Sequence, residues 1–448
     1  MKITNKIAAA LLGLGIAHQA SADPVVYLTG SSAFRATTYA SLNDNSGPVN
    51  GGVFDAGTMT RATYGSGSAS GSSYMIFHGN ISGSGVYINC AWSGSEAGIA
   101  SACNVSLNNV DRNGNTIALA GSPETWLNAT NPIILAAIAA GSVISTNPSS
   151  ASGLYEASSH GADLSQADTS QSVSWTPRVP STTTDLHDYG VEGIVTFTIT
   201  KNNQIGNSGS GIPTGASNEW AHVTNVNLDQ MCTLLSGGVL PAGFFTGNAA
   251  DSDFTVYAVG RNLGSGTRMN MLSDSTYGGK KAVQQFSIGY GVNEPATTSL
   301  VLTNEGNGGY ESGGGVAKAL GITGSCQQAD PFNGGTGWFA LGYLGPSDAL
   351  NTANNGGEPT NCWVTVGGFP SNNGTIENGQ WWLWGHEHLY GKFGISGIQN
   401  TVGGLLEAGV IKYIQINNYG ATAGGHDPAI QNSLMNVVKS SDVDFPHY

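Results

Sequence analysis

The sequence has few charged residues, and most of them are acidic. Asp, Glu, Lys and Arg make up 10% of the 448 residues, and the formal net charge is −14 at pH 7. Nucleic acids and anionic membrane surfaces attract proteins through clustered Lys and Arg. The composition therefore argues against both as partners, and any anion site must work by local geometry against an unfavourable overall charge.

Long apolar runs are missing after the first 22 residues. The longest candidate, Pro132–Ala140, is far shorter than the roughly 20 residues that cross a bilayer. At the start of the chain, Lys2 and Lys6 precede an apolar stretch, and Ala20-Ser-Ala22 has the small residues of a cleavage site. This pattern predicts a signal peptide over residues 1–22, so we expect a periplasmic or secreted protein.

Cysteine is scarce, and no Cys-x-x-Cys pair occurs among the five cysteines. A zinc ribbon and a dithiol redox pair are therefore not expected. Export makes disulfides plausible, and proximity in the sequence favours the pairs Cys90–Cys103 and Cys326–Cys362, with Cys232 left over. Sequence alone leaves this connectivity open.

Motifs of common catalytic sites are also missing. The chain has no Gly-x-Ser-x-Gly elbow, no His-Glu-x-x-His helix and no Walker loop, so we expect neither an enzyme nor a cofactor. His386 and His388 alternate as on a strand, and a solvated face is favoured over a metal site because no third ligand is near. Trp381, Trp382 and Trp384 are expected to pack in a core or between domains rather than to stack on sugars.

The remaining pattern alternates strand-like and helix-like segments, which predicts an α/β protein. A length of 448 residues predicts at least two domains, because single cores stop growing at about 250–300 residues. Residues 100–160 read as an insertion. The expected strands include Val25–Leu28, Tyr74–His78, Val86–Trp92, Val191–Ile199 and Asp253–Val259, and the expected helices include Asn131–Ala140, Asn227–Gly237, Ile398–Ile411 and Ala429–Val438.

The loop Gly260–Arg268 after the Asp253–Val259 strand carries the chemistry that oxyanions need. It combines glycines, hydroxyl side chains and the Arg261 guanidinium at the start of a helix. Backbone amides at a helix start attract anions, and a guanidinium can bond two oxygens at once. Two other strands, before Thr29–Tyr39 and Ser93–Ile99, break into similar loops rich in hydroxyl groups and glycine.

A series of segments between about residues 25 and 270 occurs in the order of a known family. They are Leu28–Gly30 with Phe34 and Tyr39, Gly94–Ile99, Ala162–Asp168, Val191–Ile194, Asn227–Gly238 and Arg261–Thr267. In this order they resemble the periplasmic phosphate-binding proteins of bacterial ABC uptake systems, which have the type II solute-binding fold. The last third of the chain matches the family only loosely.

The resemblance implies two α/β lobes with a ligand cleft between them, one lobe formed by residues 23–199 and 386–448 and the other by residues 200–385. Its site residues fall on Arg261, Ser265, Gly266 and Thr267 from one lobe. From the other lobe come Ser95, Asp168 and the backbone around Ala33 and Phe34.

Asp168 would discriminate between ligands, because a carboxylate accepts the proton that hydrogen phosphate carries and repels sulfate. Three positions depart from the family. The family's first-loop threonine falls on Ala33, so that only Ser32 can supply the hydroxyl, and Leu263 replaces the aspartate that steadies the binding arginine. Arg35 replaces a proline and is either a second guanidinium of the site or, as we favour, a surface charge.

The sequence therefore predicts a monomeric binding protein for inorganic phosphate or a related oxyanion, working with an ABC permease in the inner membrane. The alternative is an extracellular surface or matrix protein that keeps the fold without a transport role, which the substitutions at Ala33 and Leu263 favour. A third hypothesis is a secreted hydrolase that uses Asp168, and no motif supports it.

Overall fold

The computed structural model describes residues 23–439 apart from several internal stretches. These are 66–67, 106–107, 111–115, 119–123, 143, 145–152, 176–184, 203–218, 290–299, 323–324, 336 and 351–361. The signal peptide predicted over residues 1–22 lies outside the described residues.

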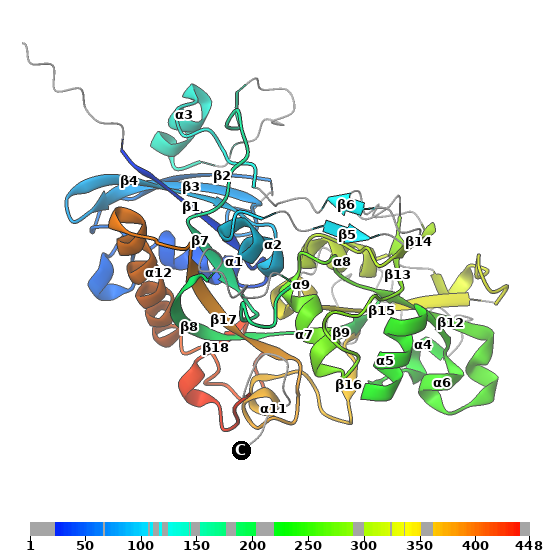
Figure 1. The fold of residues 1–448 in the computed structure, drawn as a ribbon. Helices are drawn as coiled ribbons and strands as arrows, with labels where there is room; N and C mark the ends of the chain where they lie inside the picture. Colours follow the sequence, from blue (N-terminus) through cyan, green and yellow to red (C-terminus); the bar gives the residue numbers. More distant parts are fainter. Residues whose placement is uncertain are drawn as a thin grey trace, which may run out of the picture.

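Eight strands form one mixed sheet in the spatial order β18-β8-β17-β7-β1-β4-β3-β2 (Figure 1). The central strand β1 runs parallel to β4 and β7, and the other neighbours are antiparallel. The strands are β1 Val25–Gly30, β2 Thr60–Tyr64, β3 Tyr74–Ile81, β4 Ser84–Ala91, β7 Leu164–Ala167, β8 His187–Thr196, β17 Trp384–Gly391 and β18 Ala429–Ile430.

A second, four-stranded sheet has the order β11-β12-β15-β9. Its two central strands, β12 and β15, are parallel, and β12 leads directly into the Arg261 loop. The strands are β9 Thr198–Lys201, β11 Val239–Pro241, β12 Phe254–Val259 and β15 Gly337–Leu344. Smaller pairs are β5 Asn108–Val110 with β6 Thr116–Ala118, β10 Asn225–Val226 with β16 Thr365–Val366, and β13 Gln285–Ile288 with β14 Leu302–Gly306.

Some helices begin and end at local capping signals, as α5 does. The Asn227 side chain accepts a hydrogen bond from the Gln230 amide at the start of α5, and Gly238 ends that helix in the left-handed conformation, as such caps do. The helices are α1 Arg35–Leu42, α2 Ser95–Ala102, α3 Pro132–Ala140, α4 Glu219–His222, α5 Leu228–Gly237, α6 Gly243–Thr246, α7 Gly266–Asp274, α8 Gly313–Leu320, α9 Pro346–Ala349, α11 Asn373–Glu377 and α12 Gly397–Ile416; 3₁₀ turns are Pro48–Asn50, Ala249–Asp253, Ser325–Gln327 and Asn432–Leu434.

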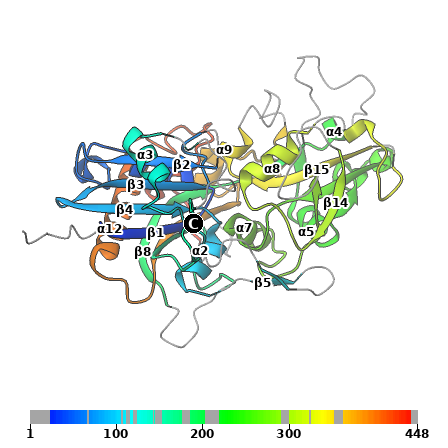
Figure 2. The same cartoon turned by 90° about the horizontal axis from the view of Figure 1, so that it is seen from above.

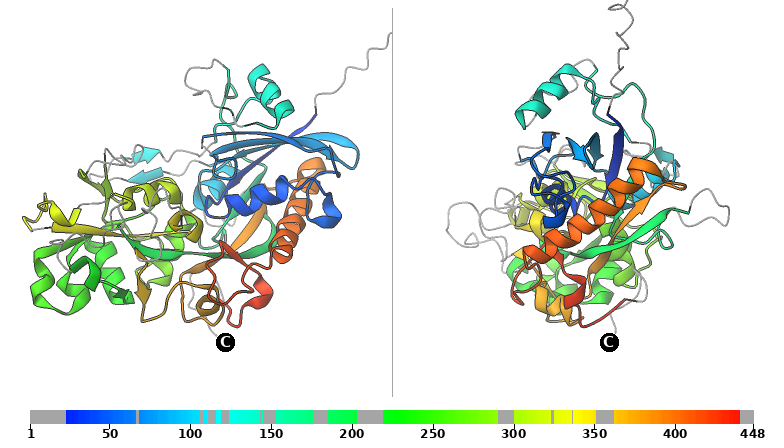
Figure 3. Two further views of the ribbon diagram at one scale, coloured as in Figure 1. Left: turned by 180° about the vertical axis from the view of Figure 1, so that it is seen from behind. Right: turned by 90° about the vertical axis from the view of Figure 1, so that its left-hand side faces the viewer.

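Both faces of the large sheet are covered. Val26 and Leu28 of β1 are fully buried in the same core as Leu406 of α12, whereas Tyr27 points to the other face, with its ring 4.9 Å from that of Trp126. This alternation follows from the two-residue repeat of a strand. Figure 3 shows α12 beside α1 on one side of the sheet and α3 on the other.

The two sheets belong to two lobes, which Figure 2 shows side by side with α2 and α7 between them. The segment predicted as one strand, Val191–Ile199, is divided at the buried Phe197, so that β8 joins the large sheet and β9 joins the small one. The chain returns to the large sheet between β15 and β17. The predicted two-lobed α/β fold is confirmed.

The helix predicted over Ala429–Val438 is wrong. Ala429 and Ile430 instead form β18 and pair with Val195 and Ile194 of β8, followed by a short 3₁₀ turn. Pairing with a strand that is distant in the sequence has overridden the local helical spacing. No helix in the described part of the chain is long and apolar enough to cross a membrane.

The predicted disulfides are also absent from the structure, because none of the five cysteines is joined in one. Cys90 is fully buried within β4, and burial raises the pKa of its thiol. Burial likewise raises the pKa of Cys326 to about 12. Closeness in the sequence was the only reason for the pairing Cys90–Cys103, and it does not bring two sulfur atoms together in space.

Candidate functional site

Arg261 lies at the boundary between the lobes, just after β12. Its side chain is 2% exposed. The guanidinium donates from Nε to the Tyr310 carbonyl at 3.3 Å and from Nη2 to the Glu311 carbonyl at 2.8 Å, both in its own lobe. Nη2 also donates to Ser32 Oγ, in the other lobe, at 3.1 Å. Arg261 therefore links the two predicted anion loops directly.

The start of α7 meets Asp168, which follows β7 in the other lobe. Ser265 caps the helix by accepting from the Arg268 amide at 3.2 Å, and Thr267 Oγ1 donates to Asp168 Oδ2 at 3.4 Å. A Cβ on Gly266 would lie 1.5 Å from Asp168 Oδ1. Only glycine leaves space for this carboxylate against the helix.

The start of α2 packs against the same point. The amide of Asp168 donates to Ser95 Oγ at 3.2 Å. The amides of Glu96 and Ala97, which would otherwise face a ligand, donate to the Gly264 carbonyl at 3.0 and 3.2 Å. The Gly264 carbonyl thus already accepts the hydrogen bonds of the amides at the start of α2. An anion bound at this helix start would need the same donors.

The loop after β1 forms the outer part of this region. The Phe34 amide donates to Ser31 Oγ at 3.3 Å, and the Phe34 ring is fully buried in the core of its lobe. Ser32 and Ala33 line a cavity of about 160 Å³ at the lobe boundary. All nine predicted site residues therefore lie in one region, with Ser95, Asp168 and Gly266 deep in it and Ser32 and Ala33 at its outer side.

Two charged residues in the cavity were not part of the predicted site. Arg35, at the start of α1, lines it with Asp348 of α9, so the surface position favoured from the sequence is wrong. Burial lowers the pKa of Arg35, and Asp348 opposes this shift. Burial also lowers the pKa of Arg261, while Asp348 raises it and Arg35 adds to the lowering. Two guanidinium groups and two carboxyl groups, of Asp348 and Asp168, therefore lie close enough at the boundary to affect one another.

A buried carboxyl from the insertion lies beside the ends of β1 and β4. Glu124 Oε1 accepts from Thr29 Oγ1 at 2.7 Å and from Ser93 Oγ. Burial raises the pKa of Glu124 to about 8, although both hydroxyl groups act in the opposite direction. The group is therefore largely protonated at neutral pH and adds little negative charge near the anion loops. No sequence motif surrounds Glu124, so only its position in space could identify it.

The tryptophan and histidine residues singled out in the sequence differ in how deeply they are buried. Trp381, Trp382 and Trp384 are 0%, 7% and 0% exposed, which confirms their packing role. His386 and His388 are half-buried on β17. Within the described residues, no group of three or more His, Cys, Asp or Glu is placed to hold a metal ion.

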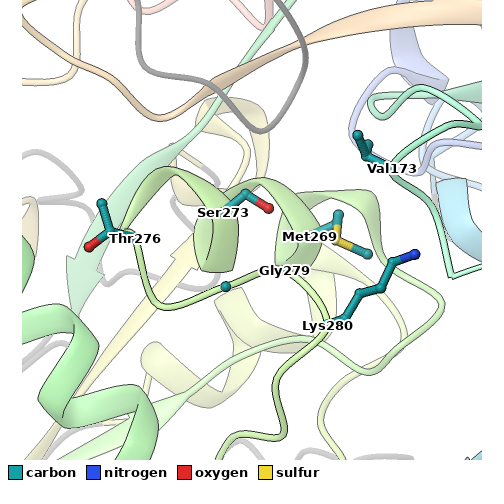
Figure 4. A pocket seen from close by; sticks show the side chains of 7 residues that line it. Val173, Met269, Ser273, Thr276, Gly279 and Lys280 are labelled. Atoms are coloured by element: carbon teal, nitrogen blue, oxygen red, sulfur yellow. The ribbon is translucent and has the colours of Figure 1, made fainter.

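Two further cavities lie away from the boundary. One, of about 370 Å³, lies beside α7 and is lined mainly by apolar atoms, with Val173, Met269 and Lys280 around it (Figure 4). The other, of about 360 Å³, lies between β8 and α12. Glu192 contributes to it, and burial raises the pKa of this carboxyl well above its usual value.

Fold and site together define a two-lobed α/β protein with a buried arginine where the lobes meet. No protein-family model matches the chain, and no curated protein matches it.

Several solved structures are similar in fold. One of them is assigned as a phosphate ABC transporter substrate-binding protein of Clostridium perfringens with bound phosphate. It is 11% identical, with 85% of this chain and 92% of that chain covered and a TM-score of 0.40. An ABC-type phosphate transport receptor of Vibrio cholerae is 10% identical, with coverages of 88% and 98% and a TM-score of 0.36. PstS of Borrelia burgdorferi is 10% identical, with coverages of 85% and 91% and a TM-score of 0.31. The likeness to these three structures concerns the fold alone.

Proposed function

We propose that the protein is an exported solute-binding protein that captures phosphate or a similar oxyanion between its lobes for ABC-type uptake. The lobes follow the predicted division, residues 23–199 with 386–448 and residues 200–385, with the crossings moved to Phe197 and Trp384 so that β9 and β17 each stay in one sheet. The observation that carries the proposal is the meeting of the Arg261 guanidinium with loops of both lobes, through Ser32 on one side and Glu311 on the other. The protein acts without catalysis and pairs with a membrane permease.

The geometry of the boundary supports an anionic ligand. Three helices, α1, α2 and α7, begin there, and helix starts carry partial positive charge. A guanidinium and hydroxyl groups from Ser32, Ser95 and Thr267 add donors, and each charge-assisted hydrogen bond contributes about 1.5–3 kcal/mol. To reach the α2 amides, an anion must displace the Gly264 carbonyl, which requires the lobes to separate as a hinge.

One observation favours a second function, that of an extracellular surface protein that keeps the fold without a transport role. The Glu96 and Ala97 amides already bond to the Gly264 carbonyl across the lobe boundary. Such a contact holds the lobes together without any ligand. A protein of this kind would be folded and would bind no small anion.

Titration calorimetry with inorganic phosphate separates the two functions. The full chain, unfolded and refolded to remove bound anions, is compared with Arg261→Ala and with Arg61→Ala as control. Arg61 lies on β2 and bonds to Asn43 and to the Gly141 carbonyl, so its removal changes the net charge equally without touching the boundary.

We expect wild type and Arg61→Ala to bind phosphate alike, and Arg261→Ala to bind it about 10- to 150-fold more weakly, because a charge-assisted bond is lost. Asp168→Asn should newly admit sulfate, since the repelling charge is gone. No heat of binding from folded wild-type protein would reject uptake of an oxyanion and favour the surface protein.

A further inference from the structure

The cavity lined by Ser32, Arg35 and Asp348 carries more kinds of polar group than a bare oxyanion needs. Its volume is about 160 Å³, room for about five groups of water size. Its walls carry hydroxyl groups of Ser32, Ser70, Thr196 and Ser347. The charged residues come from both lobes, Arg35 from the start of α1 and Asp348 from α9.

Arg35 is available to a ligand in this cavity. The side chain is half-buried, and within the described residues the structure records no hydrogen bond or ion pair for its guanidinium. Arg261 bonds to Ser32 on the cavity wall, and the charge of Arg35 helps to lower the pKa of Arg261. Two guanidinium groups within reach of one cavity favour an anionic ligand in a chain whose net charge is −14.

Asp348 gives the cavity a second chemical character. Its carboxyl lies against the start of α8, where a Cβ on Gly313 would come within 2.1 Å of Oδ2. Burial raises the pKa of Asp348, although Arg35 and Arg261 act in the opposite direction. A carboxylate here repels a bare dianion but accepts hydrogen bonds from the hydroxyl groups of a neutral substituent.

We propose that this cavity extends the oxyanion site, so that the ligand is a phosphomonoester with a short hydroxylated substituent rather than the bare ion. The phosphoryl oxygens bond to Arg261, Ser32 and Arg35. The hydroxyl groups of the substituent bond to Asp348 and to the serine hydroxyls of the wall. The inference rests on the proposed function and names the ligand class of the same site.

The test compares sn-glycerol 3-phosphate with inorganic phosphate by titration calorimetry of the full chain. The variants are Arg35→Gln, Arg35→Lys and Asp348→Asn, each checked for folding by its thermal transition. Lys412→Gln is the control, because Lys412 is exposed on α12 and its loss changes the net charge as Arg35→Gln does. Arg35→Lys keeps the charge in case the glutamine variant does not fold.

We expect wild type and Lys412→Gln to bind the ester at least about tenfold more tightly than phosphate, since two hydroxyl groups gain partners. Arg35→Gln should weaken both ligands about tenfold or more, and Arg35→Lys should weaken them less. Asp348→Asn should weaken the ester alone, whereas a purely electrostatic role of Asp348 would make both ligands bind more tightly.

Phosphate binding without preference for the ester, or equal tightening of both ligands in Asp348→Asn, would overturn this inference and leave the proposed function standing. Binding of neither ligand by folded protein would reject the proposed function, and this inference with it.

Discussion

Replacing Gly266 by alanine should push the start of α7 away from Asp168 and α2 of the other lobe. The added Cβ would lie 1.5 Å from Asp168 Oδ1 and 2.7 Å from Ser95 Cβ. Rotation of the Asp168 side chain relieves the first contact only. The Ser95 Cβ is fixed to the backbone of α2, so relief of the second contact requires α7 and α2 to move apart.

The expected cost follows from packing. Inserting a methyl group into a filled site destabilises by about 1–3 kcal/mol, and the helix gains at most about 0.5–1 kcal/mol from alanine over glycine. The net loss should be about 1–2 kcal/mol. Gly404 supplies the matched control, because it lies inside α12 with open space where its Cβ would be. Gly404→Ala should stabilise by about 0.5–1 kcal/mol.

Urea unfolding followed by tryptophan fluorescence measures both variants against wild type. We expect the midpoint of Gly266→Ala to fall and that of Gly404→Ala to rise, with unchanged slopes. Equal shifts in the two variants would refute the reasoning, because they would show that α7 and α2 are not packed as closely as the structure has them.

Two other changes test buried charges. Folding raises the pKa of Glu124 from 4.5 to about 8, so the stability contributed by its neutral form is complete below about pH 4.5 and is lost as the pH rises to 8. Glu124→Gln stays neutral, and its stability relative to wild type should grow by up to about 5 kcal/mol between pH 4 and pH 9, as urea unfolding would show; a pH-independent difference would contradict the burial. Lys439 Nζ lies 2.8 Å from Asp274 Oδ2, with the two side chains 0% and 1% exposed. Lys439→Met should lower the free energy of unfolding by about 3–5 kcal/mol, and adding Asp274→Asn should restore much of it; no recovery in the double variant would show that the charge itself is not the cause.

Much of the fold could be predicted from the sequence because its signals are local. The α5 helix has an Asn227 cap and apolar residues at helical spacing, as expected, and it is ended by Gly238, one residue beyond the predicted Gly237. The end of the chain could not be predicted in the same way. Ala429 and Ile430 have the spacing of a helix, and what makes them a strand is β8, more than 200 residues earlier in the chain.

The candidate site, too, could be predicted from the sequence only in part. The residues of the Arg261 loop and the Ser95 turn were predicted from motifs, and the structure brings them together across the lobe boundary. Asp348 has no motif around it, and its proximity to Arg261 depends on how β15 and α9 are placed. The Gly264 carbonyl could not be predicted at all, because a backbone oxygen has no sequence signature.

If the protein binds an anion at the α2 amides as proposed, the Gly264 carbonyl competes with that ligand for the same hydrogen-bond donors. Such an anion would bind only the fraction of molecules in which this carbonyl has moved away, so its apparent dissociation constant would equal the intrinsic one divided by that fraction. Tight coordination at the boundary is therefore compatible with modest overall affinity. Loosening this single backbone contact would then tighten the apparent affinity for the proposed ligand without changing any side chain that touches it.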